Sequence, residues 1–257
     1  MPQPSLPAYL DHPTPVAIAH RGGGGERHAE NSLAAIAAVR ELGYHHVELD
    51  LRATRDGVPV LFHDETLERM TGWPGGVEDR TWSELEAVHL PGGEAIPRLE
   101  EALTLWPDLR VALDFKSDAV IEPVAALVRR LKVGDRVGLG TSSQSRLSKL
   151  RAVFGPSFSY ALGPVGVLRL RLASFGLPAG GFAPGTAQVP THHHGIRIVD
   201  PWFLRAAHAR GLQVQVWTIN EAAEMDRLLG LGVDGLMTDR PTTLKQIMLE
   251  RGCWTGD

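Results

Sequence analysis

Short apolar runs alternate with helix-like segments along almost the whole chain, and this alternation is what most constrains the fold. Three of the helix-like segments end at a glycine that precedes the next apolar run, namely Gly43, Gly211 and Gly232. Glycine is typical of a helix C-terminus because it adopts the left-handed conformation without a Cβ penalty. A helix, a glycine and a buried strand in this order are typical of parallel βαβ units. The sequence therefore predicts an α/β protein with a parallel sheet.

About eight apolar runs have the length of buried strands, and they form one series without a linker. We expect strands at 16–19, 46–51, 58–62, 110–115, 137–140, 214–218 and 235–238. The segments between them predict helices at 31–42, 119–131, 145–154 and 201–210, with Asn31 as the cap of the first. Two further helices are expected, one capped by Asn220 and one that begins at Pro241. Such a series in 257 residues favours a closed (β/α)8 TIM barrel over a doubly wound open sheet, which remains the structural alternative.

Two parts of the chain depart from the regular alternation. The run at 58–62 is separated from the preceding strand by Asp56 and Gly57, so these two runs can form a hairpin extension. The segment from about 65 to 97 is rich in Trp, Pro and Gly, and we expect it to be a small insertion after the second barrel strand. Residues 162–177 fit a partly buried helix better than a membrane-touching loop. We expect one domain over residues 1–257.

Composition narrows the class of partner. The chain has 26 Lys and Arg against 30 Asp and Glu, so its formal net charge of −4 gives no reason to expect nucleic acid or an anionic membrane as a general partner. No apolar run approaches the about 20 residues that span a bilayer, so no stable membrane insertion is expected. The single cysteine, Cys253, cannot form an internal disulfide, and residues 1–15 lack the pattern of a signal peptide. The expected location is the cytoplasm, and the oligomeric state stays open.

The expected strand at 46–51 carries two carboxylates on one face. Val47, Leu49 and Leu51 alternate with Glu48 and Asp50. If the apolar side chains face the outer helices, both carboxylates point into the barrel, where they repel unless a cation neutralises them. Oxygen ligands suit Mg²⁺ or Ca²⁺, so the pair is a candidate site for a divalent cation. A surface acidic pair on an edge strand is the alternative, and spacing alone does not choose between them.

The expected strand at 110–115 repeats this pattern with Asp114 and Lys116 on one face. Asp114 is a candidate third carboxylate for the metal, and Lys116 is a candidate contact for a phosphate oxygen. An ordinary charge pair at a strand end is the alternative.

Two histidines follow expected strands. His20 and Arg21 come directly after the run at 16–19, at the edge where barrel active sites lie, and Gly22–Gly25 would let the backbone approach a ligand. His63 ends the run at 58–62. Together with a metal and a guanidinium, the two histidines could act as the acid and the base of phosphodiester cleavage. Taken alone, a histidine at a strand end is more often structural than catalytic.

Three long segments give the chain a resemblance to a known family. Residues 19–32 (AHRGG…ENS), 48–72 (ELDLRATRDGVPVLFHDETLERMTG) and 216–241 (VWTINEAAEMDRLLGLGVDGLMTDRP) closely resemble the glycerophosphodiester phosphodiesterase family. The resemblance implies a TIM barrel, His20 and His63 as acid and base, and Glu48 and Asp50 as metal ligands. It also implies that Arg21 contacts the phosphate and that Trp217 packs against the glycerol moiety.

One position departs from the family pattern. Many members have Glu, any residue, then Lys on the third barrel strand, where this chain has Asp114-Phe115-Lys116. We expect the shorter carboxylate to keep the metal site and to alter its geometry or metal preference.

The expected activity is hydrolysis of a small glycerophosphodiester to sn-glycerol 3-phosphate and an alcohol, with Mg²⁺ or Ca²⁺. The alternatives are a related phosphodiesterase acting on lysophospholipids or sphingomyelin, and a barrel that only binds phosphate ligands. The run His192–His194 is not expected to bind a metal, because three consecutive histidines cannot all face one ion in regular structure. It could instead border the mouth of the site.

Overall fold

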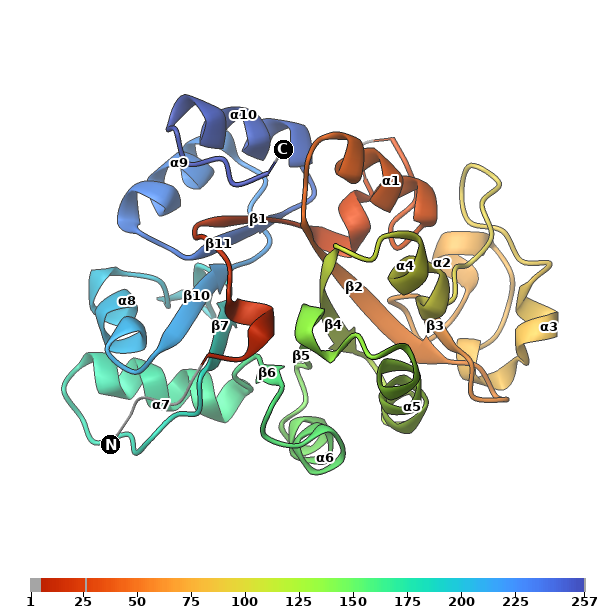
Figure 1. Ribbon diagram of the computed structural model, residues 1–257, viewed down its shortest axis with the longest axis horizontal. Coiled ribbons are helices and arrows are strands. Elements are labelled where there is room, and N and C mark those ends of the chain that lie inside the picture. Colours follow the sequence, from red (N-terminus) through yellow and green to blue (C-terminus); the bar gives the residue numbers. More distant parts are fainter. Residues whose placement is uncertain (1–5, 26, 257) are drawn as a thin grey trace.

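Parallel strands surrounded by helices close into a barrel in the computed structural model, which describes residues 6–25 and 27–256 (Figure 1). The strands follow the order β6-β5-β4-β2-β1-β11-β10-β7, and a parallel bridge from Ala161 to Thr186 joins β6 to β7. This bridge closes the ring, so the TIM barrel is confirmed and the open doubly wound sheet is excluded. The barrel strands are β1 (Val16–Ala19), β2 (His46–Ala53), β4 (Arg110–Phe115), β5 (Val137–Gly140), β6 (Ser159–Tyr160), β7 (Gly185–Val189), β10 (Leu212–Val216) and β11 (Gly235–Thr238).

Most predicted strand bounds agree with the structure, since β1, β4, β5 and β11 have the expected residues. The strand β10 begins two residues earlier than expected, because its ladder with β7 starts at the pair Leu212 and Gly185. It also ends earlier, at Val216, so that Trp217 lies past the end of the strand.

Helices cover the outside of the barrel in Figure 1. The main core lies between them and the sheet, where Val47, Leu49 and Leu51 of β2 are buried, as their alternation predicted. The segment expected to be a partly buried helix is α7, in which Leu170 and Ala173 are buried. The outer helices are α1 (Leu33–Glu41), α4 (Leu99–Leu105), α5 (Ile121–Leu131), α6 (Gln144–Phe154), α7 (Pro164–Ser174), α8 (Pro201–His208), α9 (Ala222–Leu231) and α10 (Pro241–Glu250). Within the described residues, no helix is both long and apolar enough to cross a membrane.

The predicted hairpin is present and returns the chain to the barrel. The strand β3 (Pro59–Leu61) runs antiparallel to the end of β2, with Leu61 opposite Leu51. The next residue, Phe62, donates its backbone N–H to the carbonyl of Asp50 at 3.0 Å. The residue after the hairpin, His63, is thereby brought back to the level of Asp50.

The predicted insertion follows this hairpin and lies at one side of the barrel in Figure 1. It contains α2 (Glu68–Thr71), a 3-10 turn at Val77–Asp79 and α3 (Trp82–Leu85). Its buried side chains form a second apolar cluster, separate from the main core, that includes Val60 and Phe62 of the hairpin. Apolar burial therefore attaches the insertion to the segment that carries His63.

A 3-10 turn at Ala8–Leu10 closes the end of the barrel where the strands begin. Tyr9 and Leu10 are buried there against Ala112. The guanidinium of Arg110, at the start of β4, donates to the carbonyls of Ala8 and Tyr9 at 2.8 and 3.1 Å. Residues 1–5, part of the segment in which no signal peptide was expected, lie outside the described residues.

We expect the substitution Gly138→Ala to destabilise the fold, because a Cβ on this residue of β5 would lie 2.5 Å from the Tyr9 ring. Overpacking of this kind costs about 1–3 kcal/mol of unfolding free energy. Urea unfolding of the two proteins measures the difference. The control is Gly181→Ala, whose Cβ would meet nothing within 4 Å. Equal midpoints for Gly138→Ala and the wild type would show that Tyr9 does not fill this end of the barrel.

Candidate active site

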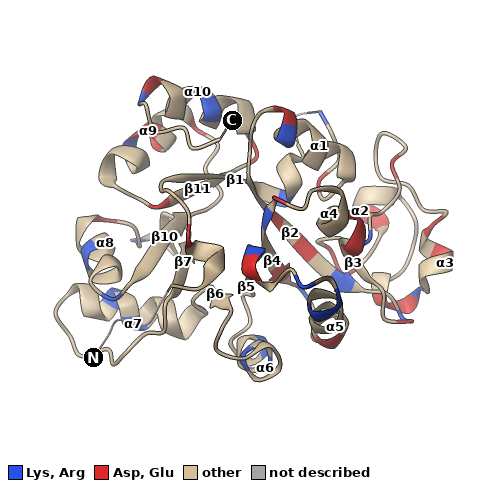
Figure 2. Cartoon of the chain, viewed as in Figure 1, with Lys and Arg blue, Asp and Glu red and all other residues tan. Residues whose placement is uncertain are grey.

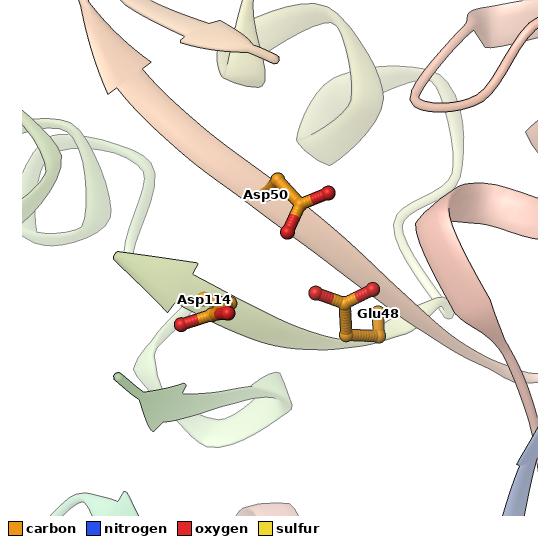
Figure 3. A group of neighbouring side chains, drawn as sticks. All are labelled: Glu48, Asp50 and Asp114. Atoms are coloured by element: carbon orange, nitrogen blue, oxygen red, sulfur yellow. The ribbon is translucent and has the colours of Figure 1, made fainter. Parts of the chain in front are cut away.

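Three carboxylates from neighbouring strands meet inside the barrel (Figure 3). Glu48 and Asp50 lie on β2, and Asp50 is opposite Asp114 of β4 in the parallel ladder. One oxygen from each of the three carboxylates lies within 4.8 Å of the others. Glu48 and Asp50 are 5% and 1% exposed, so the expectation that both point inward, away from water, agrees with the structure. Figure 2 shows these acidic positions along β2 near the middle of the molecule.

Burial and mutual repulsion set the charge state of this cluster. The pKa of Glu48 is raised well above its usual value, first by burial and then by the negative charges of Asp50 and Asp114. Burial would also raise the pKa of Asp50, but the Lys116 ammonium and the Asn31 amide lower it below its usual value. A positive charge close to Glu48 would therefore stabilise its ionised form.

Lys116 supplies one positive charge to the carboxylate cluster. Its ammonium lies 2.8 Å from Asp50 Oδ1 and 2.6 Å from Asp114 Oδ2. The pKa of Lys116 is raised because the attraction of Asp114 and Asp50 outweighs the effect of burial. Its predicted contact with a phosphate oxygen stays a prediction, since the structure shows the ammonium bound between two carboxylates.

The donor set fits a divalent cation. All the candidate ligand atoms are carboxylate oxygens, which Mg²⁺ and Ca²⁺ prefer, and an ammonium already binds two of the three side chains. Among the residues that the structure describes, this is the one group of His, Cys, Asp and Glu arranged so that three could share an ion. His192 and His193 instead lie exposed in the hairpin formed by β8 (His192–His193) and β9 (Ile196–Arg197).

His20 lies directly above this cluster, in a 3-10 turn that follows β1. Its Nδ1 donates to Asp239 Oδ1 at 2.7 Å, and its Nε2 lies 3.9 Å from Glu48 Oε2. The pKa of Asp239 is lowered, because hydrogen bonds from His20 and Asn220 outweigh the effect of burial. An ionised carboxylate only accepts, so the Nδ1 of a neutral His20 carries the proton and Nε2 is left with its lone pair.

Arg21 adopts a left-handed backbone conformation with φ 49° and ψ 40°. This is uncommon for a residue with a Cβ, and such conformations cluster at functional sites. The conformation lets the Arg21 N–H donate to Glu48 Oε2 at 2.9 Å. The following turn requires glycine at Gly23, where φ is +87° and a Cβ would lie 2.2 Å from Val39 of α1.

The Arg21 side chain lies between two acidic residues. Its NH1 donates to both carboxylate oxygens of Glu30 at 2.9 Å, and its Nε lies 3.3 Å from Asp50 Oδ2. The side chain is 20% exposed, so the guanidinium lies on the solvent side of the carboxylate cluster.

His63 has a carboxylate partner of its own. Its Nδ1 donates to Asp64 Oδ1 at 2.6 Å. The pKa of Asp64 is lowered to about 2, chiefly by a hydrogen bond from Arg69 and also by the one from His63. Asp64 is therefore ionised near neutral pH, and the Nε2 of His63, like that of His20, is not held by this contact.

Trp217 follows β10 at the same end of the barrel. Its backbone N–H donates to the carbonyl of Val189 on β7 at 3.1 Å, and the residue is 42% exposed. The structure thus places an accessible indole at the mouth. Its contact with glycerol stays a prediction.

Two residues that hold His20 in place were not among the site residues predicted from the sequence. Asp239 directly follows β11, just as His20 follows β1, so the strand-end rule that selected His20 also applied to it. Asn220 was expected to cap α9, and this was wrong, because Glu221 occupies the cap position. The Asn220 side chain instead accepts from the Asp239 N–H and donates to the Asp239 carboxylate, both at 2.9 Å.

A similar correction applies to Asn31, which was expected to cap α1. The cap is Ser32, whose hydroxyl accepts from the N–H of Ala35 at 3.1 Å. Asn31 has a φ of 60° and uses its side chain to hold Asp50, to which it donates at 2.9 Å. Short amide side chains are common both at caps and at such local contacts, so the residue type alone does not separate the two roles.

Comparisons with known proteins agree with this architecture. The model of the "Glycerophosphoryl diester phosphodiesterase family" matches residues 20–147 and 183–243. A "Probable glycerophosphodiester phosphodiesterase 2" of Mycobacterium tuberculosis is 34% identical over 254 residues, which cover 96% of each chain. A "Lysophospholipase D" of Rattus norvegicus is 28% identical over 90% of this chain and 85% of its own.

A solved structure also matches closely. The crystal structure of a putative glycerophosphoryl diester phosphodiesterase from Silicibacter pomeroyi has a TM-score of 0.77 and 26% identity, over 94% of this chain and 95% of its own. The family match covers more than half of the chain and includes every residue assigned above to the carboxylate cluster and to the two histidine pairs. The chain therefore belongs to the glycerophosphoryl diester phosphodiesterase family.

Proposed function

We propose that this chain hydrolyses glycerophosphodiesters to sn-glycerol 3-phosphate and an alcohol, with a divalent cation and with His20 and His63 as the acid–base pair. The observation that carries the proposal is the position of His20, whose Nδ1 is held by Asp239 and whose Nε2 lies 3.9 Å from a buried three-carboxylate cluster. Family membership and the Mycobacterium tuberculosis relative support the reaction class.

The two histidines suit proton transfer in the same way. Each Nδ1 is occupied by a carboxylate, from Asp239 or from Asp64, so each ring is oriented and its Nε2 remains for proton exchange. One imidazole takes the proton of the attacking oxygen, and the other protonates the leaving alcohol. The structure orients both rings in the same manner, and the assignment of acid and base to the two stays open.

The remaining groups bind the substrate. Arg21 would contact the phosphate, because a guanidinium presents paired donors to phosphate oxygens. Lys116 would add a second positive charge, and Trp217 would pack against the glycerol moiety. The formal net charge of −4 gives no reason to expect nucleic acid, and a few placed cations can hold one small phosphodiester inside an acidic protein.

Glu48, Asp50 and Asp114 would hold Mg²⁺ or Ca²⁺. When bound, the cation would offset negative charge on the phosphoryl oxygens. Its binding would also offset the burial of Glu48 and the repulsion from Asp50 and Asp114, which together raise the pKa of Glu48. The Asp114 side chain is shorter than the glutamate that many family members have at this position, but one of its oxygens still lies within 4.8 Å of oxygens of Glu48 and Asp50.

A lysophospholipid is the second candidate substrate, because a relative that is 28% identical over 90% of this chain is named a lysophospholipase D. Rates of product release from glycerophosphocholine and from lysophosphatidylcholine separate the two candidates. A rate at least tenfold higher on the lysophospholipid would replace the first assignment by the second.

We predict that His20→Ala and His63→Ala each lower kcat for glycerophosphocholine by about 10²–10⁴-fold, the usual contribution of a general acid or base. Release of glycerol 3-phosphate measures the rate, and circular dichroism verifies that the variants are folded. The control is His89→Ala, an exposed histidine of the insertion, which should keep the wild-type rate. A kcat near the wild-type value in either site variant would remove that histidine from the mechanism.

We also predict that EDTA abolishes activity and that Mg²⁺ or Ca²⁺ restores it. Glu48→Gln should raise the cation concentration for half-maximal rate by about tenfold or more, because ligand charge controls affinity for a hard cation. The matched control is Glu122→Gln, at an exposed position of α5. Activity that survives EDTA would contradict the metal requirement, whereas an unchanged titration in Glu48→Gln would exclude Glu48 alone from the ligand set.

A further inference from the structure

Arg69 lies on α2 of the insertion and binds two carboxylates that belong to other parts of the chain. Its Nε donates to Asp64 Oδ2. Its two terminal nitrogens donate to Glu30, with NH2 at 2.5 Å from Oε1 and NH1 at 3.3 Å from Oε2. Asp64 lies five residues before Arg69, whereas Glu30 lies 39 residues before it and precedes α1. One guanidinium therefore joins the insertion and the end of the hairpin to the loop before α1.

Each of these carboxylates also holds a residue of the proposed active site. The second oxygen of Asp64 accepts from His63 Nδ1 at 2.6 Å. Both oxygens of Glu30 accept from Arg21 NH1 at 2.9 Å. The result is a continuous chain of charge-assisted hydrogen bonds from His63 through Asp64, Arg69 and Glu30 to Arg21.

An arginine suits the middle of this chain because the planar guanidinium offers separate N–H groups in fixed directions. It therefore fixes how two carboxylates are oriented relative to each other, which the rotatable donors of a lysine ammonium do less strictly. The side chains of Asp64 and Glu30 are 23% and 18% exposed, and both carboxylates bind Arg69. Arg69 is thus the hydrogen-bond partner that they share.

The location of Arg69 argues against a purely stabilising role. Its side chain is 49% exposed, and ion pairs near the surface contribute little to the free energy of unfolding. Small displacements of a positioning group can nevertheless reduce a rate strongly, since about 1 Å can lower it by about 10²-fold. The same contacts are thus worth more to catalysis than to folding.

We propose that Arg69 is a positioning residue that sets His63 and Arg21 relative to each other, through Asp64 and Glu30. The insertion then supports the active site, because its apolar cluster attaches it to the hairpin and Arg69 attaches it to the segment between β1 and α1 that carries Arg21 and Glu30. This inference rests on the proposed roles of His63 and Arg21.

The test compares Arg69→Gln with Arg55→Gln. Arg55 also contacts the insertion, at the carbonyl of Asp79 and at Glu84, but neither of these residues contacts His63 or Arg21. With glycerophosphocholine, Arg69→Gln should lower kcat/KM at least tenfold, and Arg55→Gln should stay within twofold of the wild type. Arg69→Lys, which keeps the charge and loses the fork, should fall between them.

Two measurements do not depend on turnover. In nitrogen NMR of the imidazole, His63 of the wild type should be the Nδ1–H tautomer when neutral, and Arg69→Gln should gain the Nε2–H tautomer. In calorimetry, glycerol 3-phosphate should bind Arg69→Gln at least threefold more weakly, because Arg21 is no longer held by a fixed Glu30. Arg55→Gln should match the wild type in both measurements.

The outcomes separate the two proposals. A wild type that does not hydrolyse glycerophosphodiesters overturns the proposed function, while tautomer and binding still decide the role of Arg69. Wild-type values of kcat/KM, tautomer and binding in Arg69→Gln overturn the positioning role. Equal losses in Arg69→Gln and Arg55→Gln also overturn it, since they would reflect the insertion as a whole. If Arg69→Gln does not fold, Arg69→Lys becomes the test of the positioning role. A loss of kcat/KM of at least threefold in Arg69→Lys would support that role, and wild-type values would overturn it.

Discussion

Repulsion among three carboxylates inside the barrel is the constraint on which the rest of the site depends. Glu48, Asp50 and Asp114 lie within 4.8 Å of one another, two of them buried, in a place where charge is costly. The neighbouring groups are arranged to offset this cost, because Lys116 binds Asp50 and Asp114 and the Arg21 backbone donates to Glu48. The left-handed conformation of Arg21 permits this last contact, and Asp239 orients the ring of His20 one residue earlier.

The hairpin after β2 lets one βα unit supply two segments to the active-site end of the barrel. A barrel strand delivers one segment to the mouth, at its C-terminal end. Here β2 continues past the barrel to Ala53, and β3 returns antiparallel until Phe62 bonds to Asp50. This unit thereby supplies two sets of residues to the site, the carboxylates of β2 and then His63 of the returning chain. The apolar cluster of the insertion keeps the returning chain in place.

The sequence predicts the barrel well, because alternation of apolar strands and glycine-ended helices is a local signal. The inward direction of Glu48 and Asp50 follows from the two-residue period of a strand in the same way. Asn31 and Asn220 show where local reasoning fails. Both look like helix caps, yet each holds a carboxylate 19 residues further along the chain, Asp50 within β2 or Asp239 just after β11. Such contacts form when consecutive βα units pack side by side, and no local pattern encodes them.

The closed end of the barrel limits where a substrate can enter and a product can leave. Tyr9 and Leu10 fill the end where the strands begin, and Arg110 ties their backbone to β4. Tyr9 and Leu10 thus close this end of the barrel, while His20 and Trp217 follow strand ends at the opposite end. In the proposed reaction, a product released at that opposite end would leave by the route along which the next diester arrives. A phosphomonoester that stayed bound there would delay the following cycle.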